Sequence, residues 1–194
     1  MKLNKLKTNK GQSINGIALI NSDIFEDERG LFFESWNKKK FDENLELNIN
    51  FCQDNHSRSH KGVLRGLHYQ TSPKAQGKLI RCICGRIFDV AVDIRKDSKT
   101  FGQWVGVELN EENKNQLWMS EGFAHGFLTL SKKADVLYKT TEYWSKANER
   151  SILWNDKYLD IKWPLESISI QNPILSPKDA EASSFSQIEE FREI

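Results

Sequence analysis

Cysteine is scarce in this sequence, and the charges of the acidic and basic side chains almost cancel. The three cysteines, Cys52, Cys82 and Cys84, are an odd number and lack the spacing of four zinc ligands. Strand alternation would place Cys82 and Cys84 on the same face. We interpret all three as reduced thiols, buried among strands of a cytoplasmic protein.

The charge balance and the lack of a long apolar run argue against two further classes of protein. A net charge of +1, from 28 basic and 27 acidic residues, does not fit a nucleic-acid-binding surface. No apolar run approaches the length of a membrane span. The basic residues near Met1 are not followed by the apolar segment of a signal peptide. We therefore expect a cytoplasmic protein with no nucleic-acid or membrane partner.

Short strands separated by turn residues dominate the pattern from residue 49 onward. The predicted strands comprise residues 17–24, 31–36, 50–57, 63–70, 77–84, 86–93, 104–109, 115–119, 126–131, 135–141 and 151–154. Residues 25–30 mix acidic and basic side chains and end in a glycine, which predicts a turn. Many short strands with little helix predict an all-β jelly roll.

A single domain accounts for residues 1–194, with a few short helices at its periphery. Phe41 and Leu45 have helical spacing, so residues 38–47 predict one amphipathic helix. The polar residues 1–16 are expected to be an N-terminal extension that is mobile or loosely paired. Residues 178–194 are expected to be a C-terminal segment that lies on the surface as a helix.

His68 lies in a predicted strand with Arg65 three residues before it and Lys78 ten residues after it. A histidine among apolar neighbours is by default a structural residue, but the two cations favour a chemical role. Strand alternation would turn Arg65 and His68 to opposite faces, yet Gly66 permits a bulge that brings both to one cavity. A neutral imidazole suits proton abstraction near neutral pH, and nearby cations disfavour its protonation.

Polar and small residues form two further candidate clusters. Gln53, Asn55 and Ser57 share one strand face, where amides suit sugar hydroxyls or diphosphate oxygens. An ordinary polar outer face explains the same pattern equally well. His125 is flanked by small residues, which let a ligand approach closely.

Two aromatic residues, Tyr138 and Trp144, are an even number of positions apart, so strand alternation would place them on the same face. A buried tyrosine needs a hydrogen-bond partner and can serve as an acid, whereas a tryptophan offers a flat face for stacking. Core packing is the alternative explanation for both side chains.

A metal site is not expected. Open metal sites use three or four inward ligands, and a metal-dependent cupin would place two histidines one residue apart. Gln70 occupies the position two residues after His68, and no acidic residue follows before Asp89. His56 and His60, the closest pair of histidines, lie in a predicted polar turn.

Eight segments, taken together and in this order, resemble the dTDP-4-dehydrorhamnose 3,5-epimerase family. The resemblance extends from about residue 20 to residue 180, and any one segment alone would be a weak indication. The segments are FEDERGLFFES (25–35), QDNHS (53–57), VLRGLHYQ (63–70), QGKL (76–79), FDVAVDIR (88–95), TFGQW (100–104), EGFAHGF (121–127) and LSPKD (175–179).

The resemblance implies a cupin-type jelly roll, also called a double-stranded β-helix, that forms a homodimer and uses no metal or organic cofactor. It implies inversion at C3 and C5 of dTDP-4-dehydro-6-deoxy-D-glucose through enolates. The product would be dTDP-4-dehydro-β-L-rhamnose, an intermediate of dTDP-L-rhamnose biosynthesis.

The resemblance also implies roles for single residues. His68 matches the base, Asp179 the carboxylate that orients it, Lys78 the cation at the enolate oxygen and Tyr138 the acid on the opposite face. Nothing in the sequence around Asp179 indicates this role by itself. The residues that match nucleotide-sugar contacts are Arg29, Glu34, Gln53, Asn55, Arg65, His125, Glu149 and Lys178, with Arg29 and Glu34 expected to reach across the dimer.

The sequence departs from the family pattern at two positions. Trp144 stands where a tyrosine often stacks on thymine, and its larger ring should preserve binding. Ser120 stands where many members have proline. Three alternatives remain: a mono-epimerase, a cupin that moves the ketone from C4 to C3, and a non-catalytic nucleotide-sugar-binding cupin.

Overall fold

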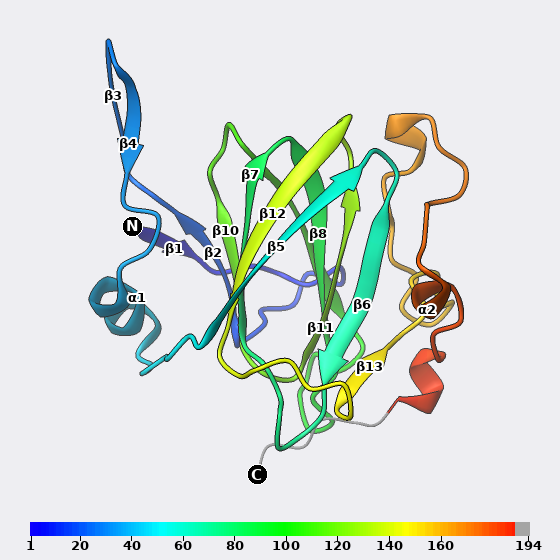
Figure 1. The fold of residues 1–194 in the computed structure, drawn as a ribbon. Coiled ribbons are helices and arrows are strands. Elements are labelled where there is room, and N and C mark those ends of the chain that lie inside the picture. The colour runs from blue at the N-terminus through cyan, green and yellow to red at the C-terminus, as the bar shows by residue number, and fades with distance from the viewer. Residues whose placement is uncertain (189–194) are drawn as a thin grey trace.

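Two antiparallel β-sheets face each other in the computed structural model, which describes residues 1–188 (Figure 1). The first sheet has the spatial order β1 (Lys2–Asn4), β2 (Ile17–Asn21), β10 (Gln116–Met119), β7 (Lys78–Cys84), β12 (Lys133–Thr140) and β5 (Gln53–His60). The second has the order β13 (Glu149–Ser151), β6 (Leu64–Gln70), β11 (Phe123–Thr129), β8 (Arg86–Asp93) and β9 (Trp104–Asn110). This all-β architecture confirms the predicted jelly roll.

A separate hairpin of β3 (Ile24–Asp27) and β4 (Gly30–Phe33) projects away from the two sheets (Figure 1). The prediction of a turn over residues 25–30 was therefore too wide, because only residues 28 and 29 separate these strands. Four large apolar side chains of the hairpin are exposed, which are Ile24, Phe25, Leu31 and Phe32.

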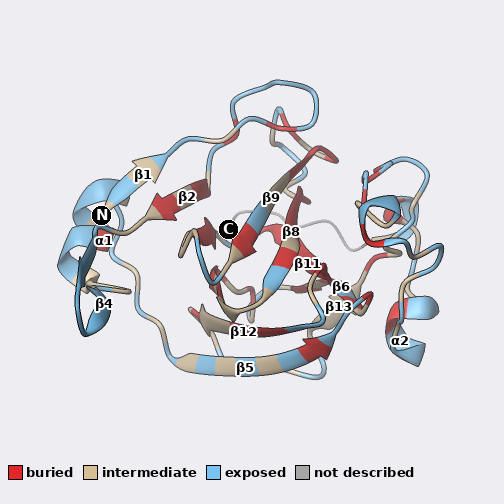
Figure 2. Ribbon diagram, turned by 90° about the horizontal axis from the view of Figure 1, so that it is seen from above, coloured by how far each residue is buried: buried red, intermediate tan, exposed pale blue. Residues whose placement is uncertain are grey.

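The start of β11 differs from the prediction. The strand was predicted over residues 126–131 but begins three residues earlier, at Phe123. Every residue of β11 is buried, so the alternation of polar and apolar side chains that marks a half-exposed strand is absent. Figure 2 shows the buried residues concentrated on strands in the middle of the molecule, whereas α1 and β4 are mostly exposed.

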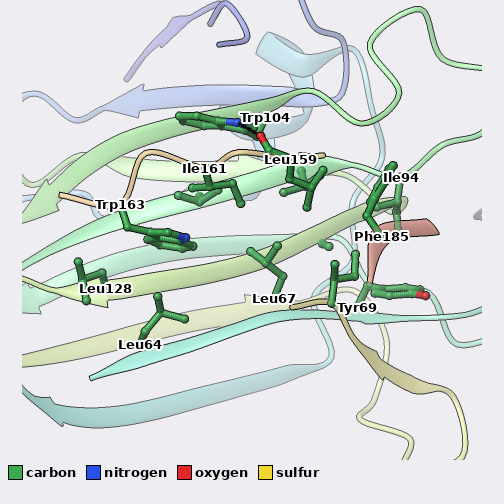
Figure 3. Close-up of a cluster of buried hydrophobic side chains, with 14 of the residues drawn as sticks. Leu64, Leu67, Tyr69, Ile94, Trp104, Leu128, Leu159, Ile161, Trp163 and Phe185 are labelled. Carbon is green, nitrogen blue, oxygen red and sulfur yellow. Dashed lines mark hydrogen bonds between the residues drawn. The ribbon is translucent and has the colours of Figure 1, made fainter. Parts of the chain in front are cut away.

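Apolar side chains cover both faces of the five-stranded sheet. One cluster lies between the sheets and joins residues such as Ile80 and Val136 to Ile87 and Phe127. A second cluster covers the outer face, where C-terminal segments pack on β6, β8 and β11 (Figure 3). Its labelled members are Leu64, Leu67, Tyr69, Ile94, Trp104, Leu128, Leu159, Ile161, Trp163 and Phe185. Burial on both faces makes this sheet the core of the domain.

A β-bulge in β6 turns Arg65 and His68 to the same side. His68 pairs with His125 of β11, whereas Arg65 pairs with Phe127, so β6 carries one extra residue over this interval. Gly66 has φ of +118°, and an ideal Cβ there would lie 2.6 Å from the Cα of Gly126. The bulge that the sequence allowed at this glycine is confirmed.

The helices are short, as predicted. α1 (Lys38–Leu45) begins at Asn37, whose side chain accepts a hydrogen bond from the Lys40 amide at 3.1 Å. It ends two residues before the predicted limit, because Glu46 takes a left-handed conformation. The remaining helical segments are η1 (Glu166–Ile168), α2 (Pro177–Ala180) and η2 (Phe185–Gln187). No helix within residues 1–188 is long and apolar enough to span a membrane.

Both terminal segments pack more closely than the sequence suggested. β1 pairs with β2, and the Thr8 hydroxyl donates a hydrogen bond to the Gln103 side chain at 2.6 Å. In the C-terminal segment Asp179 and Phe185 are buried, so it does not lie wholly on the surface. The predicted helix over residues 178–194 is reduced to α2 and η2 as far as residue 188, and its last six residues lie outside the described part.

The three cysteines are free thiols, as predicted, but not all of them are buried. Cys82 is buried between the sheets, Cys84 is half-buried and Cys52 is exposed. Cys52 directly precedes β5, an edge strand of its sheet, which explains its exposure.

Replacing Gly66 with alanine tests the close approach of β6 to β11. We expect Gly66→Ala to lower the free energy of unfolding by about 3 kcal/mol, because the new Cβ meets backbone atoms that cannot move aside. Gly11→Ala is the matched control: Gly11 also has a positive φ, but its Cβ would meet no described atom within 4 Å. It should lose about 1 kcal/mol. Equal losses in urea unfolding would contradict the role given to the close approach.

Candidate active site

A cavity of about 420 Å³ lies between the two sheets and brings together nine of the thirteen predicted site residues. These nine are Gln53, Asn55, Arg65, His68, Lys78, His125, Tyr138, Trp144 and Glu149. The two sheets form opposite walls of the cavity. His68 and His125 come from β6 and β11 of the five-stranded sheet, whereas Lys78 and Tyr138 come from β7 and β12 of the six-stranded sheet.

His68 is held by the carboxylate of Asp179, whose Oδ1 lies 2.5 Å from its Nε2. Burial acts to raise the pKa of Asp179, but the hydrogen bond and charge of His68 outweigh it, so the pKa is lowered overall. Ser176 caps α2 by accepting a hydrogen bond from the Asp179 amide at 3.2 Å. The carboxylate is therefore ionised at neutral pH and fixes one ring nitrogen of His68.

The C-terminal segment that carries Asp179 is attached to the start of β6. The Leu64 amide donates to the Ile174 carbonyl at 3.0 Å, and the Ile174 amide donates to the Gly62 carbonyl at 2.8 Å. These backbone bonds bring α2 beside His68 across a separation of 111 residues in sequence.

Lys78 is a buried cation at the wall opposite His125. Its Nζ donates a hydrogen bond to the backbone carbonyl of His68 at 3.2 Å. Burial lowers the pKa of Lys78 to about 8, although the carboxylates of Glu149 and Asp89 partly oppose this shift. At neutral pH the side chain remains mostly protonated, so the cavity contains a positive charge with little hydration.

Tyr138 enters the cavity as a neutral phenol. Burial raises its pKa, while the positive charge of Arg65 acts in the opposite direction. The hydroxyl therefore carries its proton at neutral pH and is available as an acid.

Polar side chains of β5 connect the cavity to its rim. Gln53 donates from Nε2 to the Asn55 side chain at 2.8 Å and accepts from the Trp144 amide at 3.0 Å. The indole of Trp144 is more than half exposed, so it offers a flat apolar face at the edge of the cavity. Arg65 donates from Nε to the Ser59 hydroxyl at 2.9 Å.

Lys178 does not line this cavity but contacts a residue that does. Its Nζ lies 2.5 Å from the Glu149 carboxylate. Burial acts to raise the pKa of Glu149, and the contact with Lys178 leads the effects that lower it overall. α2 thus supplies partners to two residues of the cavity wall, His68 and Glu149.

Arg29 and Glu34 lie outside the cavity of their own chain. Arg29 is in the turn of the β3–β4 hairpin, where its Nε donates to Asp27 at 3.1 Å. Glu34 follows β4 and contacts Lys40 at 2.9 Å. Their expected positions across a dimer remain predictions.

Two further polar residues belong to the site: Ser57, which the sequence placed in a cluster with Gln53 and Asn55, and Asp89, to which it assigned no role. The buried Ser57 hydroxyl faces the cavity and has no partner among the described residues. Asp89 is fully buried and contacts His125 at 2.8 Å. The available signal for Asp89 was a carboxylate among apolar residues in the middle of β8. Within residues 1–188, no three His, Cys, Asp or Glu side chains are grouped so as to hold a metal ion.

Replacing Lys78 with methionine tests the burial of its charge. Its pKa is depressed in the folded state, so the unfolded chain binds more protons between pH 8 and pH 10.5, and the lysine costs stability below that window. We expect Lys78→Met to raise the free energy of unfolding by about 1–3 kcal/mol at pH 7. The gain should shrink as the pH rises through the window.

The measurement is urea unfolding at pH 7 and at pH 10. Lys133→Met, at an exposed position that begins β12, should change stability by less than about 0.5 kcal/mol at either pH. A Lys78→Met variant that is less stable than the parent protein at pH 7 would show that its ammonium is not a net cost to the fold.

Comparisons with known proteins identify the family of the chain. The sequence profile of the dTDP-4-dehydrorhamnose 3,5-epimerase family matches residues 11–187. The enzyme of that name from Shigella flexneri is 53% identical over 189 residues, which cover 97% of this chain and 99% of the relative. The one from Salmonella typhimurium is 55% identical over 175 residues, covering 90% and 93%.

A crystal structure of similar fold is that of dTDP-6-deoxy-D-glucose-3,5-epimerase from Legionella pneumophila, in complex with dTDP-4-keto-L-rhamnose. It has a TM-score of 0.89 and 47% identity, and the match covers 100% of both chains. The segments that resemble this family in sequence are thus accompanied by its fold, with nine of the implied residues around one cavity. The chain belongs to the dTDP-4-dehydrorhamnose 3,5-epimerase family.

Proposed function

We propose that this chain inverts C3 and C5 of dTDP-4-dehydro-6-deoxy-D-glucose to give dTDP-4-dehydro-β-L-rhamnose. The observation that carries the proposal is the placement of His68 and Tyr138 on opposite walls of one cavity. A sugar ring between them would have a proton acceptor on one face and a proton donor on the other. Inversion at a carbon requires this arrangement.

The ketone at C4 makes both inversions chemically accessible. C3 and C5 flank the carbonyl, so removal of either proton gives an enolate whose negative charge lies on O4. The buried ammonium of Lys78 is the cation for this oxygen. Because this side chain is buried, water screens it little, and it stabilises the charge mainly in the transition state, where the charge develops.

His68 is the base. Its Nε2 contacts Asp179, which leaves Nδ1 as the ring nitrogen that accepts the proton from carbon. The Asp179 carboxylate orients the ring and stabilises the imidazolium that forms. In the D-gluco chair the hydrogens on C3 and C5 are both axial on the same face, so one base serves both carbons. Tyr138 then protonates each enolate carbon from the other face, and proton exchange with solvent restores neutral His68 and the Tyr138 phenol after each inversion.

The nucleotide lies toward the rim of the cavity in this proposal. Trp144 stacks on the base, since its exposed indole offers a flat surface. Arg65, with Gln53 and Asn55, contacts the diphosphate and sugar oxygens. The ion pair of Glu149 with Lys178 borders the same region and completes the polar wall.

A homodimer completes the site. The β3–β4 hairpin projects from the sheets with exposed apolar side chains, a feature typical of an interaction surface. A hairpin that crosses to a second copy would carry Arg29 and Glu34 toward the partner's cavity, in keeping with a two-fold isologous contact.

Solvent deuterium tests the double inversion. In deuterated water, the enzyme should introduce deuterium at both C3 and C5 of the keto-sugar nucleotide, because each inversion passes through a proton exchange. Product NMR gives the position of the label. Exchange at one carbon alone would indicate a mono-epimerase, and a carbonyl moved to C3 would indicate a ketoisomerase.

Two variants separate the base from the acid in the same assay. His68→Asn should lower exchange at both carbons by about 10²–10⁴-fold. Tyr138→Phe should retain exchange at the face of the base while it loses inverted product, because the enolate still forms but is reprotonated by His68. Loss of exchange in Tyr138→Phe equal to that in His68→Asn would contradict this division of roles.

Mixing two inactive variants tests the dimer. If each site combines His68 of one chain with Arg29 of the other, a heterodimer of His68→Asn and Arg29→Ala chains contains one intact site. After unfolding and refolding together, the equimolar mixture should recover about one quarter of the parental activity. A mixture of His68→Asn with Asp179→Asn provides the control, since both residues belong to one chain's cavity and no intact site forms. Absence of recovery in the first mixture would show that Arg29 does not act across the dimer, whereas an Arg29→Ala chain that is active by itself would place Arg29 outside the site.

A further inference from the structure

Asp89 of β8 is a buried carboxylate that the mechanism above does not use. Its side chain is fully inaccessible to solvent. Oδ1 lies 2.8 Å from His125 Nε2, and Oδ2 has no hydrogen-bond partner among the described residues. A buried carboxylate with a single polar contact is costly unless a positive charge lies nearby. A carboxylate buried in this way is therefore expected to have a cation in its neighbourhood.

The register of three strands places Asp89 behind the cavity. β11 lies between β6 and β8, and His125 pairs with His68 on one side and with Ala91 on the other. Asp89 pairs with Phe127, two residues along β11, so it is a diagonal neighbour of His125. His125 lines the cavity, whereas Asp89 is not among the residues that line it.

Lys78 lines the same cavity as His125, and the negative charge of Asp89 acts to raise the pKa of its ammonium. The charged groups that act on Lys78 lie on three elements other than β7. Glu149 of β13 and Asp89 of β8 favour its protonated form, whereas Lys178 of α2 opposes it. Glu149 already has Lys178 as an ion-pair partner at 2.5 Å, so its charge is partly neutralised. Asp89, by contrast, has one polar side-chain contact among residues 1–188, which is the contact with His125.

We propose that Asp89 is a positioning residue for the epimerisation, which fixes the Nε2 proton of His125 and keeps Lys78 charged where the enolate oxygen forms. The inference rests on the proposed function and deepens it. With Nε2–H donated to Asp89, Nδ1 is the nitrogen of His125 left for the substrate. Asp89 touches no substrate atom and acts through these two side chains.

The test is the pH dependence of kcat for Asp89→Asn. The amide keeps the size and a hydrogen bond to His125 but removes the charge. We expect kcat at pH 7 to fall at least about tenfold, with KM nearly unchanged. The alkaline limb of the profile should move to lower pH. Without the negative charge Lys78 loses its proton more readily, and the neutral amine no longer stabilises the enolate.

A second measurement does not depend on turnover. In protein labelled with ¹³C-lysine, the Lys78 signal is assigned by its absence in Lys78→Met, and its titration midpoint should lie lower in Asp89→Asn than in the parent. An unchanged midpoint would overturn the inference, even if the epimerase proposal holds. Failure of the parent enzyme to exchange C3 or C5 hydrogens would instead reject the proposed function. In that case the titration midpoint of Lys78 would still test whether Asp89 acts as its counter-charge.

Asp93 provides the matched control. It lies on the same strand and is also fully buried, but it binds Arg95, Ser98 and Thr100. Asp93→Asn should lower the melting temperature without moving the alkaline limb or the Lys78 midpoint. Should Asp89→Asn fail to fold, Asp89→Ser gives the same comparison with a smaller neutral side chain. Equal pH profiles for the Asp89 and Asp93 variants would reduce Asp89 to a structural role.

Discussion

The site depends on the compensation of the charged groups that lie between the two sheets. An ionised side chain in such a space costs several kcal/mol unless an opposite charge or a hydrogen bond compensates it. His68 meets Asp179, and Glu149 meets Lys178. Both partners come from α2, so the C-terminal segment must fold back onto β6 before the cavity wall is satisfied. The charge of Lys78 is compensated less fully, so its ammonium remains available to stabilise a negative charge.

Backbone geometry turns this constraint into a defined arrangement. A regular β6 would place either Arg65 or His68 against the apolar cluster on the outer face of the sheet. The bulge at Gly66 adds one residue and directs both side chains to the cavity, while Leu64 and Leu67 remain in the outer cluster. The apolar core and the polar site therefore share one strand without conflict.

The two walls of the cavity divide the chemistry between the sheets. One sheet contributes the histidines and the other the lysine and tyrosine, so the separation of the proposed base and acid follows from the jelly roll itself. Such preorganisation is costly for the fold, since a depressed lysine pKa means lost stability at neutral pH. The apolar clusters on both faces of the five-stranded sheet offset this cost.

The sequence by itself determined the strand-rich architecture and the position of most strands. Alternation, helical spacing and turn residues act over a few positions and are visible locally. It misplaced the start of β11, where complete burial removes the alternation, and it missed β3, whose four residues are all exposed. The role of Asp179 followed only from family resemblance. The tertiary structure alone decided that Asp179 meets His68 and that Asp89 lies behind His125, because these contacts join residues 111 and 36 positions apart. Such contacts depend on how strands are ordered in the sheets, which no local pattern encodes.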